Sequence, residues 1–234
     1  MRPEVICHIM SSVDGRLLPG RWSAPFGNVS PGELFKEYAT IGRELHTDAW
    51  MFGKGTTIEI FPEKFTPATT TKAIAGSSHK ARRNTGRLFI TIDPEGDILF
   101  TEGTLRDDDM LVVTGSEATA DYLAMLESKG LSYIVAPNPS DLGAVLDTIG
   151  AEFGIRRISL QGGGIIDGAM LAANVLSELS LVIYPGIDGV AASSSIFEYM
   201  GTTTNRPAAG QTLELKSCDT RPKGIIWLRY RFHR

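Results

Sequence analysis

The chain has little of three features that would assign a protein class at once: cysteine, excess charge and long apolar runs. Only two of its 234 residues are cysteine, and their spacing suits neither a zinc site nor a redox motif, which favours a reducing cytoplasm. A net charge of −4 gives no general attraction to nucleic acid or to an anionic membrane. Apolar stretches fall short of the roughly 20 residues of a membrane helix. These observations predict a cytoplasmic protein that binds neither nucleic acid nor membrane.

The composition is that of an ordinary globular protein, with 42% hydrophobic and 21% charged residues. No break in composition marks a second domain, so residues 1–234 are predicted to form one domain. Residues 62–86 are rich in proline, threonine, serine and basic residues and show no clear periodicity. This segment is predicted to be a loop excursion.

Short apolar runs alternate with helical patterns along the chain. Ser30 and Glu33 form a capping-box pattern at the start of a helix, Ser116 is predicted to begin a second helix, and Ser140 or Asp141 a third. A fourth helix is predicted over 168–177. Strands are predicted over residues 4–10, 48–53, 87–93, 109–115, 131–136, 156–161 and 178–185. The alternation predicts an α/β fold with a mostly parallel central sheet flanked by helices, and the tail 211–234 predicts an antiparallel hairpin turning at 222–224.

Three consecutive glycines, 162–164, stand between an apolar strand and a helix. Glycine costs backbone entropy on folding, so either positive φ angles or a close approach to the backbone must require it here. A helix that starts at such a turn presents unpaired N–H groups and its positive dipole end, which suits a phosphate. The spacing matches neither G-x-G-x-x-G nor the Walker pattern, because Asp167 stands where a third glycine would be. A tight turn that only serves packing is an equal alternative.

Two further segments give this turn a context. "MFGKGTTIEI" and "LQGGGIIDGAMLAANVLSELSLVIYP" resemble the cofactor-binding segments of dihydrofolate reductases. With "HIMSSVDGRLLPG", they resemble more closely the reductase domain of riboflavin biosynthesis, in which Ser-x-Asp-Gly, Gly-x-x-Thr and Gly-Gly motifs occur in this order. The resemblance covers most of the chain except residues 62–86 and the last thirty. It implies a dihydrofolate reductase-like fold, NADPH as cofactor, a homodimer and the reduction of a small heterocyclic or ribosylamino substrate.

The same resemblance implies a set of cofactor-binding residues. Lys54 would pair with the 2′-phosphate of NADPH, and Thr56 would bond the cofactor. The ends of two strands, at Thr91 and Thr114, would approach its adenosine part, although an ordinary strand role is at least as compatible with either threonine. The full set is Met10, Gly53, Lys54, Thr56, Thr91, Thr114, Gly162, Gly163, Gly164, Ile165 and Ile166.

The substrate side is predicted around the Ser-x-Asp-Gly match. Asp14 is the carboxylate expected nearest the reaction, where it would orient a hydroxyl or pass a proton, and a plain turn role is equally compatible. Ser12, Trp22 and Gln161 are the expected substrate-binding residues, with Trp22 stacking on a planar ring.

The chain also departs from this family. Gln161 stands where the riboflavin reductases carry glutamate, and the arginine that clamps the substrate phosphate is missing from "IEIFPEKFTPA". The zinc pattern of the associated deaminase is absent as well, so no metal is predicted. Two alternatives stay open: a dihydrofolate reductase that grips a pterin through Glu33 or Glu37, and a protein that binds NADPH without catalysis.

Overall fold

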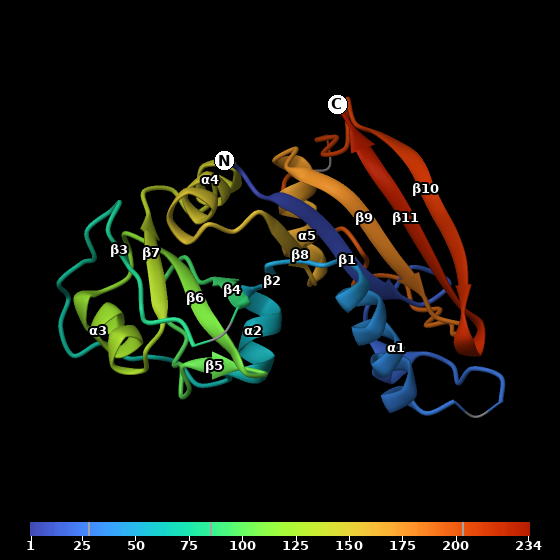
Figure 1. The fold of residues 1–234 in the computed structure, drawn as a ribbon, viewed down its shortest axis with the longest axis horizontal. Coiled ribbons are helices and arrows are strands. Elements are labelled where there is room, and N and C mark those ends of the chain that lie inside the picture. Colours follow the sequence, from blue (N-terminus) through green and yellow to red (C-terminus); the bar gives the residue numbers. More distant parts are fainter. Residues whose placement is uncertain (28, 85, 203) are drawn as a thin grey trace. The chain divides into compact units, whose positions relative to one another are not determined.

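A computed structural model describes residues 1–27, 29–84, 86–202 and 204–234, and it comprises two compact units (Figure 1). The first unit contains Met1–Pro3 and Asp48–Arg156, and the second contains Glu4–Thr47 and Arg157–Arg234. We describe each unit by itself. The assignment of residues 1–234 to a single domain stays a prediction.

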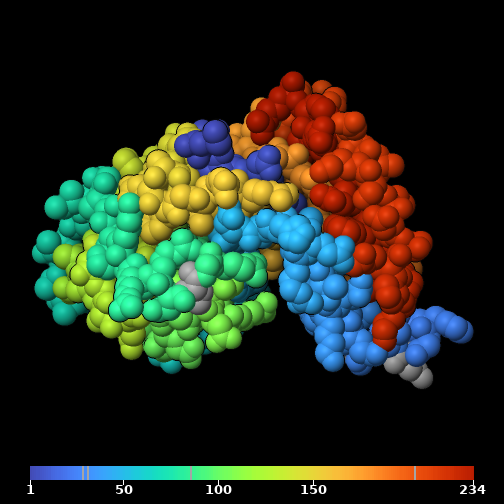
Figure 2. Space-filling view, in the orientation of Figure 1, coloured from blue at the N-terminus to red at the C-terminus, as the bar shows by residue number. Residues whose placement is uncertain are grey.

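The second unit is built on five adjacent strands in the order β10, β11, β9, β1 and β8. Strand β1 pairs in parallel with both β8 and β9, whereas β11 pairs antiparallel with β9 and with β10. Figure 1 shows β1, β9, β11 and β10 side by side, and Figure 2 shows the atoms of the hairpin on the surface. The predicted C-terminal hairpin is therefore confirmed. The bounds are β1 Glu4–Ser11, β8 Arg157–Leu160, β9 Leu176–Ile183, β10 Thr212–Arg221 and β11 Ile225–His233.

Two helices complete the second unit. Helix α1 (Pro31–Glu44) begins with the predicted capping box, in which Ser30 and Glu33 bond to each other's backbone N–H. Its apolar residues, Leu34 and Ile41 among them, pack in one core with residues of β1, β9 and β11. Helix α5 (Gly164–Ala172) begins four residues earlier than predicted, and Leu176 already belongs to β9. The prediction of a helix over 168–177 was wrong at both ends.

The first unit contains a sheet in the order β2, β4, β6, β7 and β3, with β5 paired to β6. Strands β2, β4, β6 and β7 are parallel neighbours, while the two-residue strands β3 and β5 pair antiparallel. All residues of β2, β4 and β7 are buried, as expected for a parallel sheet covered on both faces. The predicted α/β fold with a mostly parallel sheet is confirmed. The bounds are β2 Ala49–Gly53, β3 Ser78–His79, β4 Leu88–Ile92, β5 Thr104–Leu105, β6 Asp108–Gly115 and β7 Ser132–Ala136.

The helices of the first unit are α2 (Lys54–Ile60), α3 (Ala120–Ser128) and α4 (Leu142–Phe153). The predicted start of α3 at Ser116 was wrong, because Thr119 accepts the capping bond from the N–H of Tyr122. Asp141 caps α4, which resolves the choice between Ser140 and Asp141. Within 62–84, the regular structure consists of β3, which adds an edge to β7. No helix in the described residues is long and apolar enough to cross a membrane.

A buried chain of polar groups ties β1, β9, β11 and α1 together around His8. The indole N–H of Trp227 donates to the Ser180 hydroxyl over 2.8 Å, and Ser180 lies 3.1 Å from His8 Nδ1. His8 Nε2 lies 3.4 Å from the carbonyl of Tyr38, whose phenol donates to the His8 carbonyl over 2.7 Å. The neutral ring suits these partners, because Ser180 donates to Nδ1 while Nε2 donates to Tyr38. Burial lowers the pKa of His8 to about 4.

This network predicts an acid-sensitive fold. An unfolded chain takes up a proton on histidine near pH 6.5, whereas folded His8 resists protonation down to about pH 4. The free energy of unfolding should therefore fall as the pH drops from 6.5 to 4, by up to roughly 3 kcal/mol. Urea unfolding at several pH values measures this slope. His8→Gln should flatten it and the exposed-residue control His46→Gln should not; an unchanged slope in His8→Gln would refute the assignment.

Candidate functional site

The triple glycine forms the turn between β8 and α5. Gly162 has a φ of +88°, a conformation that L side chains rarely adopt, and the peptide bond between Gly162 and Gly163 is cis. A Cβ on Gly164 would lie 2.2 Å from the carbonyl oxygen of Ser195. The N–H of Glu198 donates to the Gly164 carbonyl over 2.9 Å. At the first and third glycine, the chain's own backbone therefore requires glycine.

The same turn leaves the start of α5 without a side-chain cap. Gly163 is the N-cap residue and provides no side-chain cap, so the helix starts with backbone N–H groups that have no partner within the helix. Ile165, in this first turn, is 55% exposed. The predicted cofactor residues Gly163 to Ile166 thus form a helix start that is suited to an anion.

Asp167 is a buried carboxyl in the first turns of α5 that the sequence interpretation left without a role. Burial raises its pKa well above the ordinary value, and the Cys7 thiol is its neighbour. Apart from the Cys7 thiol, its two oxygens have no hydrogen-bond partner among the described residues. The one available signal was a charged residue within the apolar segment "GGGIIDGAML".

Asp14 joins two distant segments of the second unit. Its carboxylate accepts from the Ser12 hydroxyl over 2.6 Å and from the backbone N–H groups of Gly189 and Asp188 over 2.8 and 3.1 Å. These donors lower the pKa of Asp14, the Ser12 bond most of all. The carboxylate thereby fixes the Ser12 hydroxyl and the backbone at 188–189. These contacts fit the turn role of Asp14, and its catalytic role stays a prediction.

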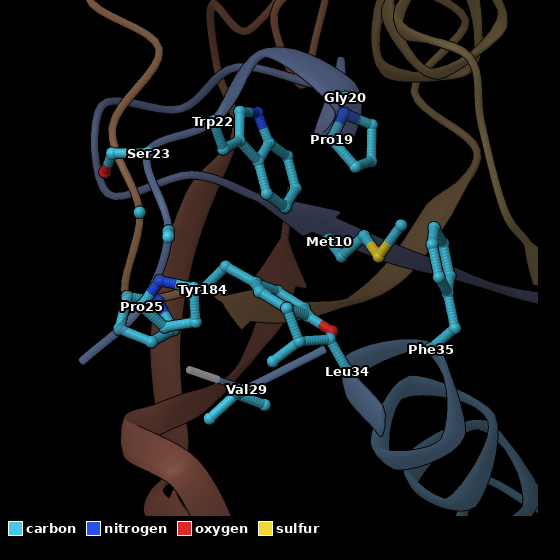
Figure 3. Close-up of a pocket in the computed structure, with 13 residues that line it drawn as sticks. Met10, Pro19, Gly20, Trp22, Ser23, Pro25, Val29, Leu34, Phe35 and Tyr184 are labelled. Carbon is cyan, nitrogen blue, oxygen red and sulfur yellow. The ribbon is translucent and has the colours of Figure 1, made fainter. Parts of the chain in front are cut away.

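An apolar pocket of about 240 Å³ lies in the second unit, between the end of β1 at Met10 and residues 184–186. Figure 3 shows the side chains of Trp22 and Tyr184 with Met10 and Phe35 around it. The rings of Trp22 and Tyr184 are 5.3 Å apart at 46°. Met10 and Trp22 are the two predicted site residues that line this pocket.

Two other predicted substrate-binding residues have partners inside the protein. Ser12 is buried and bonds Asp14. The amide of Gln161 donates to the Ser159 hydroxyl over 3.1 Å and is half-buried. Neither lines the apolar pocket. Their contact with a substrate stays a prediction.

In the first unit, Lys54 lies among three carboxylates. Its ammonium is 2.8 Å from Asp93, 2.5 Å from Glu95 and 2.5 Å from Asp97. Burial acts to lower the pKa of Lys54, but the three carboxylates outweigh it and the pKa is raised. Lys64 lies 3.2 Å from Asp97, so three carboxylates here face two ammonium groups. The sequence interpretation missed these partners, which lie about forty residues away in the turn after β4.

The remaining predicted cofactor residues of the first unit lie at the ends of strands. Thr91 in β4 is buried and lies 2.7 Å from the hydroxyl of Thr57, which bonds the carbonyl of Gly53. Gly53 is the N-cap residue of α2, and Thr56 in its first turn is half-buried. Thr114 in β6 is fully buried, and its hydroxyl has no hydrogen-bond partner in the part of the chain that the structure describes. Both strand threonines are thus enclosed by their own sheet.

Comparisons with known proteins agree on one family. The family model described as the RibD C-terminal domain matches residues 3–227. A pyrimidine reductase-like protein of Corynebacterium diphtheriae is 21% identical, with a TM-score of 0.63, over 99% of this chain and 92% of its own. Riboflavin biosynthesis reductase Rib7 of Saccharomyces cerevisiae is 16% identical, with a TM-score of 0.60, over 99% and 90%.

RibD of Acinetobacter baumannii is 16% identical, with a TM-score of 0.66, over 99% of this chain but 58% of that chain. The chain therefore spans somewhat more than half of that longer protein. A search of curated proteins gives no match. At these identities the structures establish the fold, and the predicted dihydrofolate reductase-like architecture is confirmed.

The contacts of Asp14 predict a local effect of Asp14→Asn. Because the amide is uncharged and a weaker acceptor, the N–H groups of Asp188 and Gly189 should exchange with solvent roughly tenfold faster. Hydrogen exchange followed by NMR measures both. Asp141→Asn, which weakens the cap of α4 instead, is the matched control. Unchanged exchange at Asp188 and Gly189 in Asp14→Asn would contradict the bridging role.

Proposed function

The chain belongs to the RibD C-terminal domain family, and from this premise we propose that it is an NADPH-dependent reductase of the riboflavin-biosynthesis type. It transfers a hydride to a heterocyclic or ribosylamino substrate. The observation that carries the proposal is the glycine turn 162–164, which opens α5 with uncapped amides. We further propose a homodimer in the cytoplasm. The exposed leucines of the edge strand β10, Leu213 and Leu215, favour such self-association.

The residues of the turn fit the pyrophosphate of a dinucleotide. The start of α5 supplies N–H donors and the positive end of a helix dipole at Gly164, Ile165 and Ile166. We assign pyrophosphate binding to these amides. When bound, the reduced nicotinamide supplies the hydride.

The fit to a 2′-phosphate depends on a change of partners at Lys54. The three carboxylates around it repel a phosphate as they are arranged here. The Glu95 side chain is 62% exposed and can turn into solvent, whereas the Asp93 side chain is fully buried. We propose that the phosphate replaces Glu95 at Lys54, which gives NADPH its preference over NADH. The other proposed cofactor residues are Met10, Gly53, Thr56, Thr91 and Thr114. Thr91 and Thr114 are buried, so we propose that they act by fixing the ends of their strands near the cofactor.

The chain's own residues contribute orientation and exclusion of water. Asp14 holds Ser12 and the backbone at 188–189, which keeps the turn after β1 in one position. The apolar lining around Trp22 and Met10 excludes water from a bound ring. Asp14 acts here as a positioning residue, with Ser12 and Gln161 as proposed substrate contacts.

The alternative of a dihydrofolate reductase requires a free carboxylate, from Glu33 or Glu37, to bind the pterin. Glu33 accepts from the Ser30 N–H and pairs with Lys223. Glu37 lies 2.9 Å from Arg221. Both carboxylates are thus engaged by a cation, so neither stands ready for a protonated pterin.

The cofactor proposal predicts opposite effects of two substitutions. Lys54→Met should raise the Kd of NADPH about tenfold and leave that of NADH unchanged, because it removes a charge from the 2′-phosphate. Glu95→Gln should lower the Kd of NADPH alone, since it removes a competing carboxylate. Fluorescence titration measures both constants. Lys72→Met, which breaks the exposed pair with Glu117, is the control; equal shifts for both cofactors would exclude the assignment of Lys54.

The reductase proposal predicts NADPH oxidation in the presence of a substrate. The absorbance of NADPH should fall with a ribosylaminopyrimidine phosphate or an unphosphorylated heterocycle, and not with dihydrofolate. Turnover of dihydrofolate alone would reverse the ordering of the two enzymes. Tight binding of NADPH without turnover of any of these compounds would favour a non-catalytic protein.

A further inference from the structure

The apolar pocket of the second unit indicates the chemical class of the ligand. Its described lining includes no charged side chain, although it is formed by chain segments that carry several charges. A group with a formal charge would lose its hydration here without gaining an ion-pair partner. The lining residues are Met10, Pro19, Gly20, Trp22, Ser23, Ala24, Pro25, Val29, Leu34, Phe35, Tyr184, Pro185 and Gly186.

Three charged residues beside the lining form ion pairs with residues outside it. Arg21, next to Gly20 and Trp22, forms a two-bond pair with Asp188 at 3.1 Å. On α1, Glu33 pairs with Lys223 and Glu37 with Arg221. Each of these charges is balanced by a partner outside the lining. The pocket therefore presents a neutral surface to its ligand.

The shape of the lining favours a flat ring. Trp22 and Tyr184 form an aromatic wall, with ring centroids 5.3 Å apart. Figure 3 shows Met10 and Phe35 on one side of this wall and Val29 and Pro25 on the other. The volume of about 240 Å³ is below that of pockets for drug-sized ligands, so it admits one or two fused rings.

Two polar groups in the lining have no hydrogen-bond partner among the described residues, the indole N–H of Trp22 and the hydroxyl of Tyr184. Tyr184 is only 3% exposed, and its hydroxyl forms no hydrogen bond with the described residues. In Figure 3 this hydroxyl points toward Leu34 and Phe35 on α1. A buried O–H without an acceptor is costly, and a carbonyl or ring nitrogen of a ligand would relieve that cost.

We propose that this pocket binds an uncharged, planar heterocycle of one or two rings that accepts a hydrogen bond from Tyr184. This inference rests on the proposed reductase function and narrows its substrate to an unphosphorylated ring. Reduction of a ring C=N bond would place the hydride of the reduced nicotinamide on carbon and a proton from water on nitrogen, leaving the oxidised nicotinamide. The missing phosphate-clamp arginine and the neutral lining agree with this substrate class.

Binding of lumazine, an uncharged bicyclic pyrimidinedione, tests the proposal by titration calorimetry on the full chain. Tyr184→Phe should raise the Kd of lumazine about tenfold, because it removes one hydrogen bond and leaves the ring in place. Tyr199→Phe makes the same chemical change at an exposed tyrosine outside the pocket and should have no effect. Leu34→Trp, checked for folding by circular dichroism, should abolish binding by filling the pocket.

The second arm compares a ribosylaminopyrimidine with its 5′-phosphate. The phosphate should improve the Kd by no more than twofold, because the described lining of the pocket contains no cation. An improvement of tenfold or more, an unchanged Kd for lumazine in Tyr184→Phe, or no binding of lumazine would overturn the proposal. NADPH oxidation is measured in the same samples. If lumazine binding depends on Tyr184 but no NADPH is oxidised, the reductase function is refuted and the pocket assignment holds. If NADPH is oxidised at the same rate in Tyr184→Phe, the pocket assignment alone is refuted.

Discussion

The backbone of residues 195–198 crosses the start of α5 so closely that Gly164 has no room for a side chain. The same segment continues from the loop that Asp14 binds at 188–189, and Arg16 donates to the carbonyl of Ser193 over 2.9 Å. One stretch of chain therefore connects the turn after β1 with the glycine turn before α5. The positions of both candidate-site turns in the second unit depend on this close approach.

The proposed phosphate site at Lys54 and the apolar pocket differ in how their charges are balanced. In the first unit, carboxylates enclose Lys54 and leave an excess of negative charge around a site proposed for a phosphate. In the second, Arg21, Glu33 and Glu37 beside the apolar pocket each have an oppositely charged partner, and the described lining is neutral. In the proposed function, cofactor choice depends on the exchange of ion-pair partners at Lys54, and substrate choice depends on ring shape and one hydrogen bond. This difference allows the two selections to be changed independently by substitution.

The sequence predicted the longer strands, the hairpin and the capping box, because these depend on local periodicity and on residues within a few positions of each other. It did not predict the two-residue strands β3 and β5. It missed α2, whose first turn, Lys54 to Thr57, combines glycine with β-branched threonines and gives a weak helical signal. The partners of Asp14 lie 174 and 175 residues away, so no spacing rule could connect them. The glycines were correctly recognised as a turn, but the need for glycine at 164 arises from the chain's own Ser195 carbonyl.

The central claim is that the first amides of α5 bind a nicotinamide dinucleotide. Titration of isotope-labelled protein with NADPH, followed by the backbone NMR signals of Gly164, Ile165 and Ile166, measures this most directly. The account predicts that these amide signals shift saturably, with a common Kd. Saturable binding that moves other signals and leaves all three of these amides unchanged would contradict it.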